Sequence, residues 1–168
     1  MTGLFSPLKV KSFTLRNRIV LPPMANNMSD DSGAVTDAHI DHYVRRAEAG
    51  VGMVIVEHAY VRRDGRIHES QLGIHNDALI PGLRRLAEAV KACGAVVGVQ
   101  VNHGGGKASR VTAGDYPLAP SEGTVPGGSE PALVLSIAQI AEIVEAFVAA
   151  ARRALAAGFD FVEIHGAH

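Results

Sequence analysis

Three stretches of the chain share one order of polar and apolar positions. In each, a segment with helical periodicity ends at a glycine, and a continuous apolar run follows within a few residues. Glycine just past a helix end takes the left-handed conformation that caps helices. Uninterrupted apolar runs are typical of strands buried on both faces of a parallel sheet. The glycines are Gly50, Gly94 and Gly158, and the predicted strands are 53–56, 96–99 and 161–164.

Polar residues ahead of these segments predict where the helices begin. Thr36 is a good N-cap, and a helix opening near Asp77 would hold Pro81 in its first turn. Ser136 and Gln139 have the spacing of a capping box. The helix after Ser136 is the clearest, because its apolar residues recur at steps of three and four and predict one apolar stripe. The stripe comprises Ile137, Ile140, Ala141, Val144, Phe147, Val148, Ala151 and Leu155.

A further strand at 18–21 precedes the first helix, and segments 8–11 and 13–15 predict a short hairpin before it. The order is therefore a hairpin followed by strands that alternate with helices. Such repeated units predict a parallel sheet with right-handed crossovers. An open doubly wound sheet and a (β/α)8 barrel both fit this order. Segment 104–131 lacks periodicity and is rich in Gly, Pro and Ser, and a loop of that length in a compact domain is usually functional.

The composition is typical of folded proteins and excludes some classes of binding partner. Hydrophobic residues make up 47% and charged residues 20%, and the net charge is −1 with no long run of one sign. We therefore expect no nucleic-acid partner and no membrane partner. The N-terminus has no signal-peptide pattern, and no stretch reaches the roughly 18 apolar residues of a membrane span. The single cysteine, Cys93, cannot form an internal disulfide and fits a reducing compartment, so we expect a cytoplasmic protein.

Polar side chains gather where the predicted strands end. In barrels and in open α/β sheets alike, ligands bind at the carboxyl ends of the strands. Four successive strands would therefore direct polar groups to one face, and we expect the functional site there. These groups are segment 22–27 after the first strand, Glu57 and His58 after the second, Gln100, Asn102 and His103 on the third, and His165 and His168 after the fourth.

Two other patterns are weaker candidates for chemistry. Segment 104–109 resembles a phosphate-binding loop, but Val101 and Ala108 stand where that motif requires Gly and Ser or Thr. The pairs His39/His42 and His165/His168 have spacings found in metal sites. The first pair lies on a predicted helix, where a structural role is the better interpretation, and the second has no compelling further ligand. We expect no metal, and a metal-dependent barrel hydrolase that uses His165 and His168 is the less favoured alternative.

Four stretches of the chain resemble the NADH:flavin oxidoreductase/Old Yellow Enzyme family. They are 15–20 running into Pro23-Met24, 52–57 with Gly65-Arg66, 99–105, and 158–168. Segment 117–121 also resembles the family's loop before its third helix. The similarity extends over the whole chain, in order and with matching spacing.

The resemblance implies an α/β fold of the (β/α)8 TIM-barrel type that holds FMN at the carboxyl face of the strands. Residues 1–168 would form the N-terminal half of that FMN-binding domain, with the hairpin, about four strands and three helices. The implied function is NAD(P)H-driven reduction of an activated alkene, usually an enone. Reduced FMN would pass hydride from N5 to the β-carbon of this small-molecule substrate, and NAD(P)H would reduce the flavin again.

The resemblance also assigns roles to individual residues. Pro23, Met24 and Ala25 would run beside the flavin ring, Ala59 would lie near it, and Gln100 would hydrogen-bond its pyrimidine edge. His165 would lie against the flavin and, with His168, hold the carbonyl oxygen of the substrate. Hydride addition to an enone builds negative charge on that oxygen, and two fixed N–H donors stabilise the charge.

The chain departs from the family in three respects. Ala25 stands where the family usually has Cys or Thr, and segment 103–107 lacks the usual arginine, for which Lys107 is the candidate replacement. Family members are also about twice as long, and the tyrosine that donates a proton would follow His168. Half a barrel leaves strand edges unpaired, and such edges invite association. We therefore expect a homo-oligomer, and a non-catalytic half-barrel that associates with itself or with a second half is the main alternative.

Overall fold

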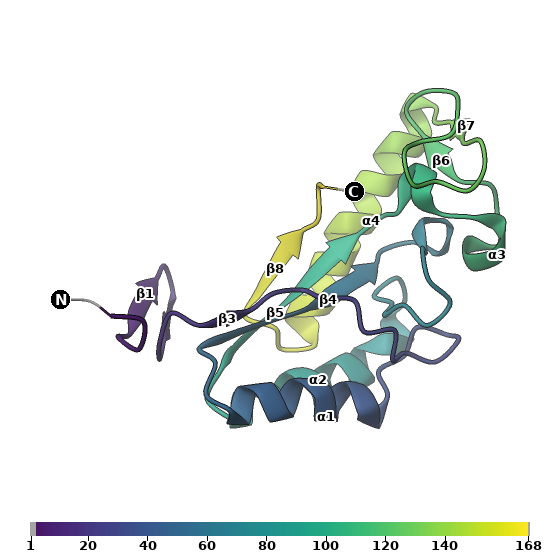
Figure 1. Cartoon of the computed structure of the whole chain (residues 1–168). Coiled ribbons are helices and arrows are strands. Elements are labelled where there is room, and N and C mark those ends of the chain that lie inside the picture. Colours follow the sequence, from purple (N-terminus) through teal and green to yellow (C-terminus); the bar gives the residue numbers. More distant parts are fainter. Residues whose placement is uncertain (1–2, 168) are drawn as a thin grey trace.

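The computed structural model describes residues 3–167, and the predicted roles of His168 lie outside this range. Its central sheet has four parallel strands in chain order: β3 (Val20–Leu21), β4 (Met53–Tyr60), β5 (Val96–Asn102) and β8 (Phe161–Ile164). A doubly wound sheet reverses its strand order at a switch point, whereas a barrel keeps it. The sequential order therefore decides between the two predicted architectures in favour of the barrel (Figure 1).

Three long helices alternate with these strands and cover one face of the sheet (Figure 1). They are α1 (Asp37–Glu48), α2 (Ile80–Ala92) and α4 (Ile137–Ala156). α1 packs beside α2, and α2 packs beside α4. Sequential parallel strands with helices on one side confirm the predicted arrangement.

The helix ends follow the signals in the sequence. The hydroxyl of Thr36 accepts the backbone N–H of His39 at 3.3 Å, and both hydrogen bonds of the capping box at Ser136 are present. A short 3-10 turn, η2 (Asp77–Leu79), precedes α2 and is capped by the side chain of Asn76. The three predicted cap glycines all have left-handed backbones, with φ values of 100° at Gly50, 79° at Gly94 and 88° at Gly158.

The core lies between the sheet and the inner faces of the helices. β4 and β5 are buried along most of their length, as their continuous apolar runs predicted. From α2, Leu83, Leu86 and Val90 pack into this core and are fully buried. Burying one such leucine stabilises the fold by about 1.5–3 kcal/mol.

The N-terminal hairpin, β1 (Leu8–Val10) and β2 (Phe13–Leu15), lies at the start of the strands. The ring of Phe13 stacks on Phe161, the first residue of β8, with centroids 6.0 Å apart. Arg16 follows the hairpin and donates hydrogen bonds to the carbonyl oxygens of Ala47 at 2.6 Å and Cys93 at 2.8 Å. These carbonyls lie at the C-terminal ends of α1 and α2, where a guanidinium group satisfies free acceptors and complements the helix dipole.

The connections after β4 and β5 carry short elements of their own. The first contains the 3-10 turn η1 (Arg63–Gly65). The second, predicted as an aperiodic loop, contains η3 (Gly105–Lys107), α3 (Arg110–Ala113) and the strands β6 (Leu118–Ala119) and β7 (Leu133–Val134), which pair in parallel. These pieces are two to four residues long, too short for periodicity to reveal. Together they form an extension beyond the carboxyl ends of the strands (Figure 1).

Most of the apolar stripe predicted on the last helix lies on the exposed surface. Ile137, Val144 and Leu155 are 82%, 54% and 67% exposed, while Ala150 and Ala154 are fully buried. α4 is apolar on two faces, and the larger residues dominate the periodicity although the small alanines allow close packing on the sheet. The predicted stripe is therefore present, but of its large residues only Phe147 packs against the core. No helix in the described range is both long and apolar enough to cross a bilayer.

Candidate functional site

A cavity of about 570 Å³ opens at the carboxyl ends of the strands. This volume lies within the range of small-molecule and cofactor sites. Each of the four strand ends contributes to its lining, together with the loops after β4 and β5. The lining residues are Pro23, Met24, Ala25, His58, Ile67, His68, Gln100, Lys107 and His165.

Most of the predicted site residues meet in this cavity. Segment 23–25 forms one part of the wall, and Gln100 and His165 form others. Ala59 is not in the lining, because its side chain is fully buried in the core. The pairing of β4 with β5 shifts register between Val56 and Ala59, and it is His58 that reaches the cavity.

The sequence places His58 at a strand end but assigns it no role. Its ring centroid lies 6.2 Å from that of His165 and 6.1 Å from that of His68. With Lys107, these rings give the wall three imidazoles and one amine. The positive charge of Lys107 in the lining favours neutral or negatively charged ligands.

Gln100 is fixed in place by a neighbouring strand. Its side chain is only 6% exposed, and its amide nitrogen donates to a carboxylate oxygen of Glu163 at 2.6 Å. The two residues are register partners in the pairing of β5 with β8. The amide can still accept through its oxygen and donate through its second N–H, which suits a ligand edge that carries both donors and acceptors.

A buried amide holds the loop that brings Ile67 and His68 to the cavity. The side-chain oxygen of Gln71 accepts the backbone N–H of Ile67 at 2.8 Å. Its nitrogen donates to the carbonyl of His58 at 3.1 Å and to the side chain of Asn102 at 3.0 Å. Asn102, expected among the site residues, is thus buried behind the cavity and supports its wall.

The carboxylate of Glu57 also points away from the cavity. One oxygen lies 2.6 Å from Nε2 of His39 on α1, so this carboxylate makes its contact inside the protein and not with the cavity. His42 packs edge-on against Tyr43, with ring centroids 4.9 Å apart. Among residues 3–167 no group of three or more His, Cys, Asp or Glu side chains is arranged to hold a metal ion.

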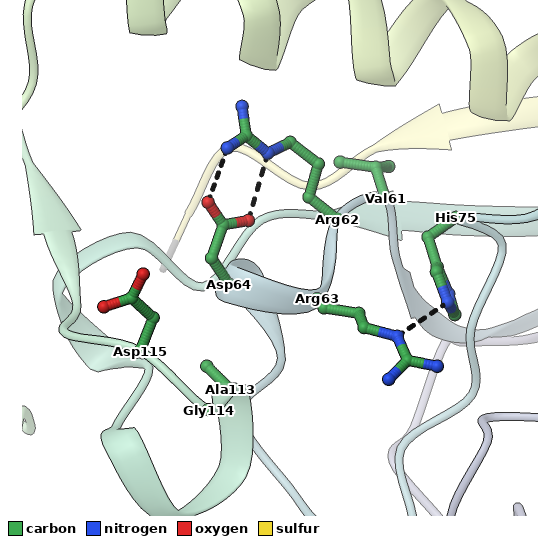
Figure 2. Close-up of a pocket in the computed structure, with 8 residues that line it drawn as sticks. All are labelled: Val61, Arg62, Arg63, Asp64, His75, Ala113, Gly114 and Asp115. Carbon is green, nitrogen blue, oxygen red and sulfur yellow. Dashed lines mark hydrogen bonds and ion pairs between the residues drawn. The ribbon is translucent and has the colours of Figure 1, made fainter.

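A second hollow, of about 430 Å³, lies between η1, His75 and the end of α3. Figure 2 shows Arg62 turned toward Asp64 and Arg63 turned toward His75, with Asp115 on the side away from His75. Arg62 and Asp64 form an ion pair at 2.7 Å. Burial, assisted by the nearby positive charges of Arg63 and two further arginines, lowers the pKa of His75 to about 4. The hollow therefore offers mixed, largely paired charges and no concentration of one sign.

Similarity to known proteins extends over almost the whole chain. Residues 3–168 match the NADH:flavin oxidoreductase / NADH oxidase family. The NADPH dehydrogenase of Clostridium acetobutylicum is 42% identical over 165 residues, which cover 98% of this chain and 48% of that protein. The NADPH dehydrogenase of Bacillus pumilus is 43% identical over 168 residues, which cover 99% of this chain and 49% of that protein.

Solved structures agree with this assignment. The Old Yellow Enzyme homologue from Zymomonas mobilis superposes with a TM-score of 0.90 at 28% identity, covering 97% of this chain and 48% of its own. Morphinone reductase in complex with tetrahydroNAD superposes with a TM-score of 0.89 at 30% identity, and the match covers 98% of this chain and 49% of that one. The fold is thus the N-terminal half of an Old Yellow Enzyme barrel, and the chain spans about half the length of the curated relatives it matches. On the match of residues 3–168, the chain belongs to the NADH:flavin oxidoreductase / NADH oxidase family.

Proposed function

We propose that the protein is an FMN-dependent oxidoreductase of the ene-reductase type, with residues 1–168 as the N-terminal half of the FMN-binding domain. It takes reducing equivalents from NAD(P)H and passes hydride to the β-carbon of an activated alkene such as an enone. The observation that carries the proposal is the shared cavity. Segment 23–25, Gln100 and His165 come from three separate strand ends and line one hollow.

The cavity suits a flat, polar-edged ring. Pro23, Met24 and Ala25 supply an apolar wall, and Gln100 supplies an amide that can donate to and accept from the ring's edge. Lys107 adds a positive charge in the lining, which would favour the additional negative charge of a reduced ring. When bound, FMN supplies the hydride chemistry, and the protein supplies binding, orientation and polarity.

His165 is the residue of this lining that we assign to the substrate. An imidazole N–H placed at the carbonyl oxygen stabilises the charge that builds there, and loss of one such donor typically costs about 10² to 10³ in rate. His58, whose ring centroid lies 6.2 Å away, adds a second imidazole to the same part of the cavity. The resemblance assigns the partner donor to His168.

The relatives support a nicotinamide as the source of electrons. Two of them are NADPH dehydrogenases, and one structural neighbour is described in complex with tetrahydroNAD. We therefore propose NAD(P)H as the reductant of the bound flavin.

The test uses a joined protein, in which residues 1–168 are followed by the C-terminal half of the Clostridium acetobutylicum NADPH dehydrogenase. We expect it to be yellow, to oxidise NAD(P)H and to reduce cyclohexenone. His165→Ala should lower enone turnover by about 10² while leaving the FMN content nearly unchanged. A folded joined protein that binds no FMN would contradict the proposal, as would full enone turnover in His165→Ala.

A further inference from the structure

The loop that carries Met24 to the cavity is anchored through its next residues. The backbone N–H of Asn26 donates to a carboxylate oxygen of Glu57 on β4. Earlier in the loop, two prolines have no N–H to donate, and the N–H of Met24 donates within the loop, to the carbonyl of Pro22 at 2.9 Å. The hydrogen bond from Asn26 to Glu57 therefore ties the far end of segment 22–25 to β4, while the pairing of β3 with β4 holds its start.

The other oxygen of Glu57 is held by a helix. It lies 2.6 Å from Nε2 of His39, and the two side chains are 1% and 0% exposed. A buried carboxylate is costly unless donors satisfy it, and here each oxygen has one. Nδ1 of His39 has no hydrogen-bond partner within residues 3–167, so the imidazole that carries its proton on Nε2 is the form that satisfies Glu57.

A tyrosine completes this arrangement. The hydroxyl oxygen of Tyr43 accepts the backbone N–H of Glu57 at 2.8 Å and the side-chain N–H of Asn26 at 3.3 Å. Burial raises the pKa of Tyr43 far above its ordinary value, so the hydroxyl remains neutral. Asn26 is thus held at both its backbone and its side chain. The following residue, Asn27, has a left-handed backbone with φ of 52°, a conformation that asparagine adopts more readily than most residues.

We propose that Glu57 and His39 are positioning residues that set the place of loop 22–25 against the cofactor. Neither side chain lines the cavity, and they act through the backbone of Asn26. The inference rests on the proposed function, because it takes this loop as a wall of the flavin site. A reacting or binding group must be held to within a fraction of an ångström by its supporting residues, and Glu57 connects this wall to both β4 and α1.

Two substitutions at Glu57 separate positioning from general destabilisation. Glu57→Met keeps the volume but removes both acceptors, which leaves two buried N–H groups unsatisfied. Glu57→Gln keeps one acceptor for the N–H of Asn26, and its amide can donate to the other tautomer of His39. Leu86→Ala is the matched control, because Leu86 is fully buried in α2 and has no part in these bonds.

The measurement is hydrogen exchange of the peptide 22–28 in the 168-residue chain. We expect Glu57→Met to speed its exchange at least tenfold relative to peptides of α2 and β5, and Glu57→Gln to restore most of the protection. Leu86→Ala should speed exchange in α2 at least as much as in 22–28. Unchanged protection of 22–28 in Glu57→Met would overturn the inference, and so would a rise that Leu86→Ala reproduces.

FMN affinity in the joined protein gives a second readout. We expect Glu57→Met to weaken FMN binding about tenfold more than Leu86→Ala, with Glu57→Gln close to the unchanged protein. Equal affinity in Glu57→Met and the unchanged protein would overturn the positioning role. Failure of the folded, unchanged joined protein to bind FMN would instead reject the proposed function, and hydrogen exchange would still decide whether Glu57 holds the loop.

Discussion

The side-chain nitrogen of Gln100 lies 2.6 Å from a carboxylate oxygen of Glu163, the residue opposite it on the neighbouring strand. Gln100 lines the candidate flavin cavity, and Glu163 determines which way its amide faces. Because Glu163 holds the amide nitrogen of Gln100, the amide oxygen already has a fixed orientation and does not need to reorganise when a ligand binds. Preorganisation of this kind raises affinity by lowering the cost of ordering the side chain.

Removing this support should weaken cofactor binding. We predict that Glu163→Leu in the joined protein lowers FMN affinity about tenfold, equivalent to about 1.4 kcal/mol, because the amide of Gln100 is no longer preoriented. Glu163→Gln is the control, because its side-chain oxygen can still accept from Gln100. Quenching of flavin fluorescence on binding measures both. An affinity for Glu163→Leu equal to that of the control would show that Glu163 does not orient the amide.

Ala25 offers no side-chain hydrogen bond to a bound ring. We predict that Ala25→Thr in the joined protein raises the flavin reduction potential by about 10–30 mV, because a hydroxyl donor worth about 0.5–1.5 kcal/mol would favour the charge of the reduced ring. Ala25→Val adds the same bulk without the hydroxyl and should leave the potential nearly unchanged. Potentiometric titration distinguishes the two, and a fall in potential with Thr would contradict the prediction.

His75 should make the fold less stable in acid. Its pKa is lowered to about 4 in the folded protein, chiefly by burial and then by Arg63, whereas an unfolded histidine titrates near 6.5. The unfolded state therefore binds more protons between these values, and stability from this group is complete above about pH 6.5 and is lost as the pH falls toward 4.

His75→Phe removes this titration and retains the stacking on Tyr60, whose ring centroid lies 4.7 Å away. Between pH 7 and pH 4.5 the free energy of unfolding of the unchanged chain should fall by about 1–2 kcal/mol more than that of His75→Phe. This value is reduced to allow for the partial exposure of the ring. Urea unfolding at the two pH values measures this difference. Equal losses in both proteins would mean that His75 is not the group responsible.

The exposed apolar stripe of α4 should drive association of the 168-residue chain. Val144 is 54% exposed on this stripe, and β8 beside it is paired only with β5 within the described residues and presents an open edge. We predict that residues 1–168 elute as dimers or larger species, and that Val144→Lys shifts the elution toward the monomer. Glu145→Lys, one residue along on the exposed surface, is the control and should not.

The N-terminal half of the barrel could be predicted from the sequence because its signals are local. Glycine caps, the capping box and continuous apolar strands each involve residues a few positions apart. Asn17 differs from them. Its side chain accepts the nearby N–H of Ile19 at 3.0 Å, but it also donates to the carbonyl of Gly50 at 2.7 Å, 33 residues along the chain, and so joins the segment before β3 to the end of α1.

The parts that were missed depend on contacts between distant residues. The buried face of α4 could not be predicted from the sequence, because Ala150 and Ala154 carry little hydrophobic signal and only their close packing on the sheet marks them as core. Glu57 was grouped with the site because it ends a strand, although its partner His39 lies on α1. His58, to which the sequence assigned no role, lines the cavity, whereas Ala59 is buried in the core.

Titration of FMN into the joined protein tests the central claim most directly. We predict near-stoichiometric binding, at least a tenfold loss of affinity in Gln100→Leu, and no loss in Arg63→Ala, which alters only the second hollow. Circular dichroism would establish that each variant is folded. A folded joined protein that does not bind FMN, or one whose affinity depends on Arg63 and not on Gln100, would contradict the assignment of the cavity as the flavin site.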